Sequence, residues 1–223
     1  MELLRHLLDA DPAGPRLTVY DEHTGARLDF SATTLDNWAA KVATMLLEEL
    51  DLDADSRILI DLPVGWQAAA IALGAMAAGV DHTLDPGAPA AGPDDLDVVF
   101  TSPERAGDHP GPDLVLVTDD PFGRGVAETG GTLPPGAVDF GPTVRFYPDV
   151  FPAPTMSLAD LAESTDIPAG ARVLATGWTD DASFTRQVLE PLAVVGSTVG
   201  VSGFAEAARL DAIAEAEKVT LRL

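Results

Sequence analysis

Hydrophobic positions follow a strand, helix, strand pattern between residues 58 and 89, the most regular part of the chain. The run at 58–60 is rich in β-branched residues and is typical of a strand buried on both faces of a parallel sheet. Apolar residues then recur at helical spacing over 66–77, and Gly79 follows where a left-handed helix cap needs a residue without a Cβ. The alternation over 80–84 predicts the second strand.

The preceding residues predict a short helix, a hairpin and a long helix. Leucines at helical spacing mark the first helix over residues 3–8. Residues 16–30 form two apolar-rich arms around Gly25, which suits the turn of a hairpin. An apolar stripe over 35–50 predicts the long helix, which Thr33 opens.

The C-terminal half alternates strands with helices. We expect a Pro/Gly/Ala loop at 87–93 and an extended surface segment, without helical or strand period, at 119–142. Pro191 should kink or restart the helix around it, and Gly196 should end that helix. The predicted strands are 97–100, 113–117, 172–175, 197–201 and 219–223, and the predicted helices are 156–163, 184–192 and 205–216.

This alternation predicts an α/β fold of mostly parallel sheets flanked by helices. A chain of 223 residues with 46% hydrophobic content is large enough for a real core. We expect an N-terminal α/β subdomain at 1–118, an irregular Gly/Pro-rich connection at 119–154, and a second, smaller α/β subdomain at 155–223.

The charge balance narrows the choice of partners. Thirty-six acidic against 13 basic residues give a formal net charge of −23, which opposes phosphate backbones and anionic membrane surfaces. Nucleic acid and membranes are therefore excluded as partners. Two interpretations of the excess of acidic residues stay open. The acidic residues form a solvated surface typical of proteins from a GC-rich or salt-adapted genome, or they form a binding surface for a basic partner protein.

Metal and cofactor chemistry is not expected. The absence of cysteine excludes disulfides, thiolate metal sites and cysteine nucleophiles. His6, His23, His82 and His109 fall in separate segments and suggest no metal cluster. The sequence has no run of about 18 apolar residues and no signal-peptide pattern, so we expect a cytoplasmic protein.

Two short motifs carry little weight. The sequence Gly-Ser-Thr-Val-Gly at 196–200 has Thr198 where a nucleophile elbow needs a serine, so a core strand is expected there. The acidic run at 51–55 lacks the glycine and the bidentate acid of a calcium loop, since Ser56 and Leu62 stand at those positions.

Two segments resemble the adenylate-forming superfamily of acyl-CoA synthetases, peptide-synthetase adenylation domains and luciferases. Residues 15–89 are similar to its N-terminal subdomain, with Leu-Asp-Phe-Ser at 28–31 matching the first core motif and the Gly-rich helix end at 73–79 matching the second. Residues 169–223 are similar to the region that follows the phosphate loop in that family. The resemblance implies the fold of a truncated N-terminal domain, and we expect relatives among short proteins of actinobacterial type.

The family's phosphate-binding loop, closed by Pro-Lys-Gly, has no counterpart here. Residues 101–168 contain no lysine. Activating a carboxylate with ATP requires groups that stabilise charge on the departing pyrophosphate. In the family, the adenine-binding motif and a mobile C-terminal domain follow the region that here ends at Leu223, so we expect neither. No catalytic residue can be carried over.

The resemblance places an acyl-pocket loop directly after the strand at 172–175. Its candidate ligand-binding residues are Thr176, Gly177, Trp178 and Asp180, since ligands of open α/β sheets collect beyond the carboxyl ends of strands. The alternative for Trp178 is packing against the helix that begins near Ala182.

The combined reading is a catalytically degenerate protein that acts as a binding or interaction module, either as a homodimer or with a partner protein. The alternative is an enzyme or ligand-binding protein that retains an acyl, adenylate or nucleotide pocket near 176–181. A small-molecule ligand is left open, and no cofactor is expected.

Overall fold

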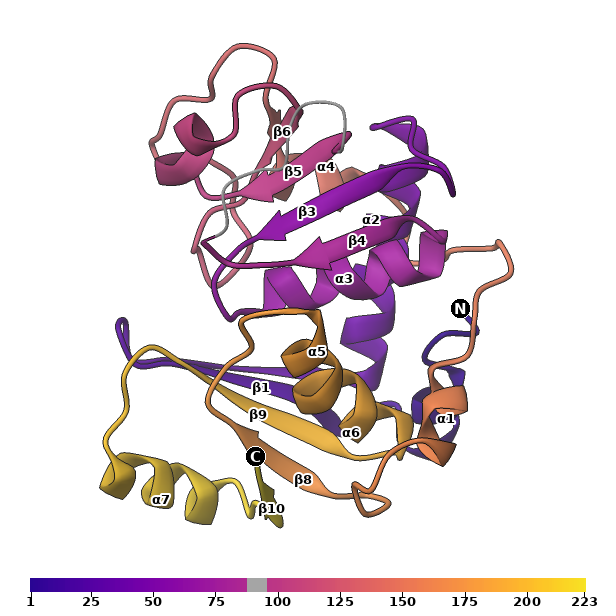
Figure 1. Cartoon of the computed structure of the whole chain (residues 1–223), viewed down its shortest axis with the longest axis vertical. Helices are drawn as coiled ribbons and strands as arrows, with labels where there is room; N and C mark the ends of the chain where they lie inside the picture. Colours follow the sequence, from indigo (N-terminus) through magenta and orange to yellow (C-terminus); the bar gives the residue numbers. More distant parts are fainter. Residues whose placement is uncertain (88–95) are drawn as a thin grey trace. The chain divides into compact units, whose positions relative to one another are not determined.

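The computed structural model describes residues 1–87 and 96–223, which contain two five-stranded sheets flanked by helices (Figure 1). The described residues form two compact units. The central unit comprises Met1, Asn37–Pro63 and Gln67–Thr155, and the hairpin unit comprises Glu2–Asp36, Val64–Trp66 and Met156–Leu223. The predicted α/β class is confirmed, while most of the predicted loop at 87–93 lies outside the described residues.

The sheet of the central unit is parallel throughout, in the order β4-β3-β5-β6-β7. Both faces of β3 are covered, since Ile58, Leu59 and Ile60 are all buried, as a buried parallel strand requires. The helix predicted after it is present, and Gly79 adopts a φ of 73° at its end. The elements of this unit are β3 (Arg57–Asp61), α3 (Trp66–Ala78), β4 (Asp81–Leu84), β5 (Val98–Thr101), η1 (Pro103–Asp108), β6 (Asp113–Leu116), β7 (Val138–Asp139) and α4 (Phe140–Phe146).

The hairpin unit has a mixed sheet in the order β10-β8-β9-β1-β2. The predicted hairpin is confirmed, because β1 and β2 pair antiparallel and Gly25 in their turn has a φ of 75°. Its elements are α1 (Arg5–Ala10), β1 (Pro15–Asp21), β2 (Ala26–Ser31), η2 (Leu158–Glu163), β8 (Arg172–Ala175), α5 (Asp181–Phe184), the π-helix η3 (Thr185–Leu189), α6 (Glu190–Ala193), β9 (Ser197–Ser202), α7 (Ala207–Ala216) and β10 (Leu221–Arg222). The long helix α2 (Ala32–Glu48) contributes residues to both units.

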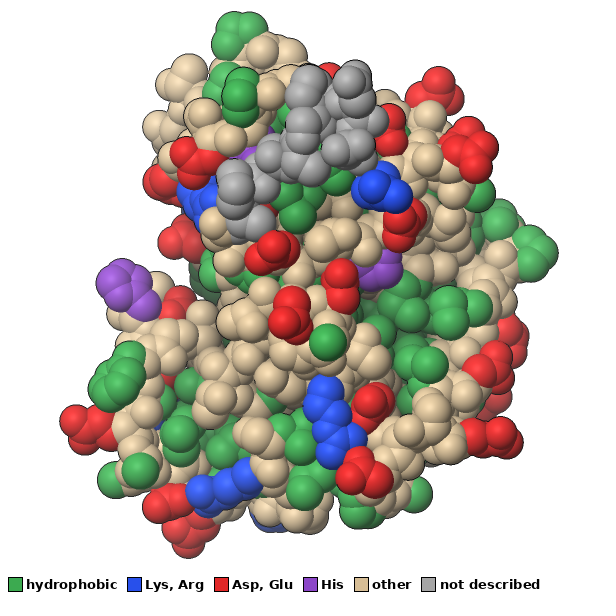
Figure 2. Space-filling model, viewed as in Figure 1, with side chains coloured by type: hydrophobic (Ala, Val, Ile, Leu, Met, Phe, Trp, Pro, Cys, Tyr) green, Lys and Arg blue, Asp and Glu red, His purple; other side chains and the backbone are tan. Residues whose placement is uncertain are grey.

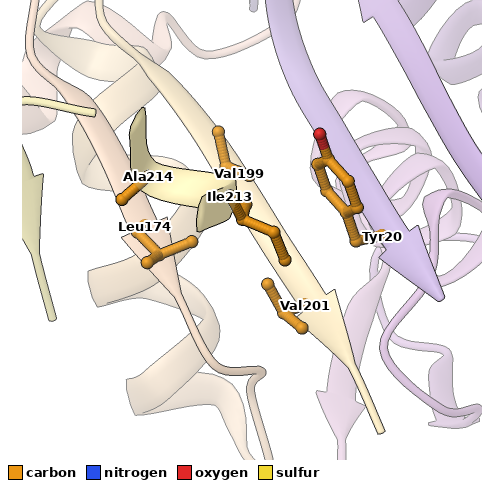
Figure 3. Close-up of a cluster of buried hydrophobic side chains, with 6 residues drawn as sticks. All are labelled: Tyr20, Leu174, Val199, Val201, Ile213 and Ala214. Atoms are coloured by element: carbon orange, nitrogen blue, oxygen red, sulfur yellow. The ribbon is translucent and has the colours of Figure 1, made fainter. Parts of the chain in front are cut away.

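One face of this mixed sheet is covered by α7. Ile213 and Ala214 point from the helix onto Leu174, Val199 and Val201 of the strands, with Tyr20 at the side (Figure 3). The inward orientation of Ile213 and Ala214 agrees with the helical spacing in the sequence.

Each of the two units is built from segments that are distant in sequence. Strand β1 pairs in parallel with β9, so that Leu17 lies opposite Thr198. Residues 2–36 therefore group with the C-terminal part of the chain. Local hydrophobic periodicity carries no information about which distant strands pair.

The extended, aperiodic segment predicted over 119–142 is confirmed for residues 119–137, which contain no helix or strand, but not for its end. Residues 138–142 form β7 and the start of α4, and Val126 and Phe140 are buried. The Asp139 carboxylate accepts hydrogen bonds from the backbone N–H groups of Val126 (2.9 Å) and Ala127 (3.3 Å). Hydrogen bonds from the backbone to a carboxylate order this segment. Such bonds do not require a regular spacing of apolar residues, so they cannot be recognised from the hydrophobic pattern of the sequence.

The start of α2 also differs from the prediction. The helix begins at Ala32, and the hydroxyl of Ser31 accepts a hydrogen bond from the Thr34 N–H at 3.1 Å. Thr33, expected to open the helix, instead donates its hydroxyl to the Pro12 carbonyl at 3.0 Å. The N-terminal cap is thus two residues earlier than expected.

Pro191 interrupts its helix as predicted, through a π-helical turn before α6. A proline has no N–H for the carbonyl four residues earlier, which here belongs to Gln187. The hydroxyl of Thr198, fully buried in β9, donates to that carbonyl at 2.6 Å. Thr198 therefore has a structural role in a core strand.

Thr198→Val is expected to lower the free energy of unfolding by about 1–3 kcal/mol, because it removes the buried hydrogen bond to the Gln187 carbonyl with little change in side-chain volume. Urea unfolding measures the loss. The additional substitution Pro191→Ala restores a backbone N–H at position 191 that can donate to the Gln187 carbonyl. Thr198→Val should therefore lower the free energy of unfolding less in the Pro191→Ala protein than in the parent protein. An equal loss of stability with and without Pro191→Ala would contradict the proposed link between Thr198 and the carbonyl left without a donor by Pro191.

Candidate functional site

The loop after β8 holds the four candidate residues, and Trp178 dominates it. Its indole is 1% exposed and meets the ring of Phe184 edge-on, with centroids 5.3 Å apart. A Cβ added at Gly200 of β9 would lie 3.5 Å from Trp178 Cζ3, so the ring also covers this glycine. The side chain thus fills the space between α5 and β9, which was the alternative given by the sequence.

Asp180 is the N-cap of α5. Its carboxylate accepts hydrogen bonds from the N–H (2.7 Å) and the hydroxyl (2.6 Å) of Ser183, and the Ser183 hydroxyl accepts one from the Asp180 N–H (3.0 Å). These bonds, led by that from the Ser183 side chain, lower the pKa of Asp180. The carboxylate therefore serves as a helix cap, and its Oδ1 accepts both hydrogen bonds from Ser183.

The other two candidates differ in exposure. Gly177 has a φ of 105°, and a Cβ there would lie 2.8 Å from Val64 Cγ2, so both backbone conformation and space demand glycine. Thr176 is exposed. The structure brings the four residues together in one loop, but three of them serve the fold.

A shallow depression of about 320 Å³ lies elsewhere in the hairpin unit, between α7 and β10, and none of the four candidates lines it. Asp211 and Glu215 make its wall acidic, and Arg222 is ion-paired to Asp211 at 2.6 Å. An acidic wall of this kind disfavours an anionic ligand such as a nucleotide.

A buried polar cluster at the carboxyl end of the central sheet was missed by sequence reasoning. The carboxylate of Asp61, at the end of β3, accepts hydrogen bonds from the Gly87 N–H (2.8 Å), the Thr101 hydroxyl (3.0 Å) and His109 Nε2 (2.7 Å), and it is ion-paired to Arg105 (3.0 Å). Asp61, Thr101 and His109 are almost completely buried. We call this set the Asp61 cluster.

A signal for this cluster exists in the sequence. Asp61 and Thr101 each end an apolar strand, and the parallel register places them opposite one another. Polar residues at the carboxyl ends of neighbouring strands mark the edge where ligands of α/β sheets bind. The cluster nonetheless consists of groups that satisfy one another, apart from His109 Nδ1, which is buried without a hydrogen-bond partner among the described residues.

Arg27 and Arg172 of the mixed sheet are both engaged with Glu217. Glu217 accepts hydrogen bonds from Arg27 Nε (2.8 Å), the Tyr20 hydroxyl (2.6 Å) and the Arg172 guanidinium. Burial alone would raise the pKa of Glu217, but these three donors outweigh it and lower the pKa to about 2. The neighbouring Arg209 is held by Glu22 at 2.8 Å. This network uses its cations internally, which disfavours it as a phosphate site.

Glu217→Gln is expected to destabilise the protein most near neutral pH. The folded-state pKa lies below the unfolded value, so the stabilisation is present above the unfolded pKa and is lost as the pH falls from about 5 to about 2; its upper limit is about 3 kcal/mol. Chemical unfolding measured across this pH range should show that the difference in free energy of unfolding between the variant and the parent protein shrinks as the pH falls. Glu215→Gln, at an exposed position in the last turn of α7 two residues before Glu217, is the matched control and should show no pH-dependent loss of stability. A stability difference that does not change with pH would contradict stabilisation by the ionised Glu217 carboxylate.

Among residues 1–87 and 96–223, no group of three or more His, Asp or Glu side chains is arranged to hold a metal ion. In the same residues, no helix has both the length and the apolar character needed to cross a membrane.

Comparison with known proteins supports the fold. No protein-family model matches the sequence. The fold resembles that of the Brucella canis acyl-CoA synthetase, with a TM-score of 0.78 and 15% identity over 99% of this chain and 47% of that one. It also resembles the anthranilate CoA ligase AuaEII, crystallised with anthranoyl-AMP, with a TM-score of 0.69 and 14% identity over 98% of this chain and 48% of that one. The chain thus spans about half the length of these two structures, and its fold is similar to the N-terminal part of acyl-CoA synthetases, as the sequence resemblance implied.

A sequence relative covers nearly the whole chain. The TIGR03089 family protein of Mycobacterium tuberculosis is 35% identical, over 98% of this chain and 95% of its own length. At this identity and coverage, the chain belongs to the TIGR03089 family.

Proposed function

We propose that this protein is an acyl-CoA-synthetase-like binding or interaction module that does not activate carboxylates with ATP. The observation that carries the proposal is the burial of Trp178, at 1% exposure, in the loop whose family counterpart lines the acyl pocket. A side chain packed between α5 and β9 leaves an acyl group no room at that position. Asp180 is likewise committed to capping α5.

The cations of the central unit support the same proposal. Residues 101–168 contain no lysine. The ammonium group of Lys41 is ion-paired to Asp149 at 2.9 Å. Arg105 is paired with Asp61, and Arg145 with Glu128 at 2.5 Å. Binding a triphosphate would require breaking such pairs in a protein of formal net charge −23.

Exchange of labelled pyrophosphate into ATP tests the absence of activation directly. We expect no exchange above background with the purified chain across a panel of carboxylic acids, while an active acyl-CoA synthetase serves as positive control. Exchange that depends on added acid would overturn the proposal.

The second function is a ligand-binding protein or enzyme that retains an acyl, adenylate or nucleotide pocket. The place of residues 176–181 at the carboxyl end of β8 favours it. Thermal unfolding with ATP, AMP and acyl-adenylate analogues separates the two, since a ligand at 100 times its dissociation constant adds about 2.7 kcal/mol of stability. We expect no shift with any of these compounds.

An interaction module needs an exposed surface, and several large apolar side chains are exposed. Phe122, Phe146 and Val150 are exposed in the central unit, and Phe204 in the hairpin unit. Both a second copy of this chain and a different partner protein fit this part of the proposal. Sedimentation equilibrium over a range of concentrations distinguishes self-association from a monomer that binds elsewhere.

A further inference from the structure

Phe146 is an exposed aromatic residue at the end of α4, a helix whose other large apolar side chains are buried. Phe140 and Val144 of the same helix are buried, whereas the Phe146 side chain is 85% exposed. It meets the ring of Tyr147 edge-on, with centroids 5.8 Å apart. Tyr147 is itself buried, its hydroxyl donates to Glu49 at 2.8 Å, and its carbonyl accepts from Lys41. The exposed Phe146 ring is therefore next to a buried, hydrogen-bonded residue, Tyr147.

Acidic side chains lie near Tyr147, the residue that follows Phe146. Glu48 and Glu49 follow one another at the end of α2, and Asp149 comes three residues after Phe146. Burial raises the pKa of Tyr147 to about 12, together with its hydrogen bond to Glu49 and the negative charges of Glu49 and Glu48. Lys41, the neighbouring base, is largely covered and is held by Asp149. The exposed face thus combines an aromatic ring with three carboxylates, of which Asp149 is ion-paired to Lys41 and Glu49 accepts a hydrogen bond from Tyr147.

Val150 is the next exposed large apolar side chain after Phe146 in the sequence. Its side chain is 66% exposed and follows Asp149 directly. We call the set formed by Phe146, Val150, Glu48, Glu49 and Asp149 the Phe146 patch.

We propose that the Phe146 patch binds an arginine-rich amphipathic segment of a partner protein. Apolar side chains of that segment cover Phe146 and Val150, and guanidinium groups pair with Glu48, Glu49 and Asp149. Arginine suits both parts of the patch, because it stacks on aromatic rings and binds carboxylates in a bidentate manner. This inference rests on the proposed function as an interaction module and specifies its partner.

Charge argues against a second copy of this chain as the occupant. Each copy carries a formal net charge of −23, so two acidic patches brought face to face would repel. Figure 2 shows the same imbalance on the face in view, where acidic side chains are spread over the surface and few basic ones lie among them. A basic segment gains from this field both in approach and in the bound state.

The test uses a fluorescein-labelled peptide of leucine and arginine, designed as an amphipathic helix, titrated with the full-length chain. Binding should be saturable and should weaken as salt is raised, because the charges are solvent-exposed. Phe146→Ser should weaken it at least about tenfold, as expected when an aromatic hot spot is removed. Phe204→Ser is the matched control, since Phe204 is equally exposed, at 86%, in the hairpin unit. A peptide with serine in place of leucine and the same charge should bind more weakly.

Three outcomes would overturn the inference. These are equal loss of binding in both variants, absence of saturable binding, and a self-associated parent protein that Phe146→Ser dissociates. Circular dichroism of both variants confirms folding, which is expected because both side chains are exposed. Pyrophosphate exchange on the same preparations keeps the two proposals apart: exchange would refute the proposed function whatever the peptide does, and absence of both exchange and binding would refute the Phe146 patch alone.

Discussion

Trp178→Ala is expected to lower the free energy of unfolding by about 3–5 kcal/mol, the range for removing a large aromatic side chain from a packed core. The ring is buried, meets Phe184 edge-on and covers Gly200, so its removal leaves a cavity between α5 and β9. Urea or guanidinium unfolding followed by circular dichroism measures the loss. The two remaining tryptophans, Trp38 and Trp66, keep a fluorescence signal available for a second probe.

Trp178→Phe is the control for shape. It retains most of the ring volume and removes an indole Nε1 that is buried without a hydrogen-bond partner among the described residues. We expect a change within about 1.5 kcal/mol, as for other volume-conserving replacements. If Trp178→Ala were as stable as the parent protein and gained affinity for acyl-adenylate analogues, the ring would be a lid over a ligand pocket, and the second function would replace the first.

The elements with strong local patterns could be predicted from the sequence. The strand at β3, the helix α3 with Gly79 at its end, and the hairpin around Gly25 all follow from periodicity and from positions that need a positive φ. Each of these features is decided within about 15 residues, since helical and strand periods are local properties. The position of the candidate loop after β8 could also be predicted, because it depends on one strand end.

Features set by distant contacts could not be predicted. The turn after α6 is one example, where Gly196 was expected to end the helix and Val195 instead has the positive φ, at 61°. The guanidinium of Arg16, from the start of β1, donates to the Val195 carbonyl at 2.7 Å, and a Cβ at Gly196 would press against the Ala171 carbonyl. The strain of a β-branched residue in this region is thus supported by partners far away in sequence.

The Asp61 cluster depends on distant contacts in the same way. Its members come from β3, from the end of β5, from η1 and from positions 87 and 109, and only Asp61 and Thr101, which end apolar strands, carry a signal in their own sequence context. Only the parallel register of β3 and β5 brings Asp61 opposite Thr101. The same limit applies to Trp178, because its burial depends on Phe184 and Gly200 together.

Asp61→Ala is expected to lower the free energy of unfolding by about 3–5 kcal/mol, because it removes a buried carboxylate that is ion-paired to Arg105 and accepts hydrogen bonds from the buried side chains of Thr101 and His109. Arg105, Thr101, His109 and the Gly87 N–H would lose their common acceptor. Chemical unfolding measures the loss, and amide exchange at Gly87 should become faster if the cluster fastens this residue to the sheet.

Asp81→Ala is the matched control for that experiment. Asp81 lies at the start of β4 in the same sheet and is also paired with an arginine, Arg57, at 3.1 Å, but its side chain is 64% exposed. An exposed pair contributes about 0–1 kcal/mol, so the two aspartates should differ by several-fold in effect. If Asp61→Ala were neutral or stabilising, the carboxylate would be retained at the expense of stability, as expected of a functional residue. The carboxyl edge of the central sheet would then replace the loop after β8 as the first place to search for a ligand.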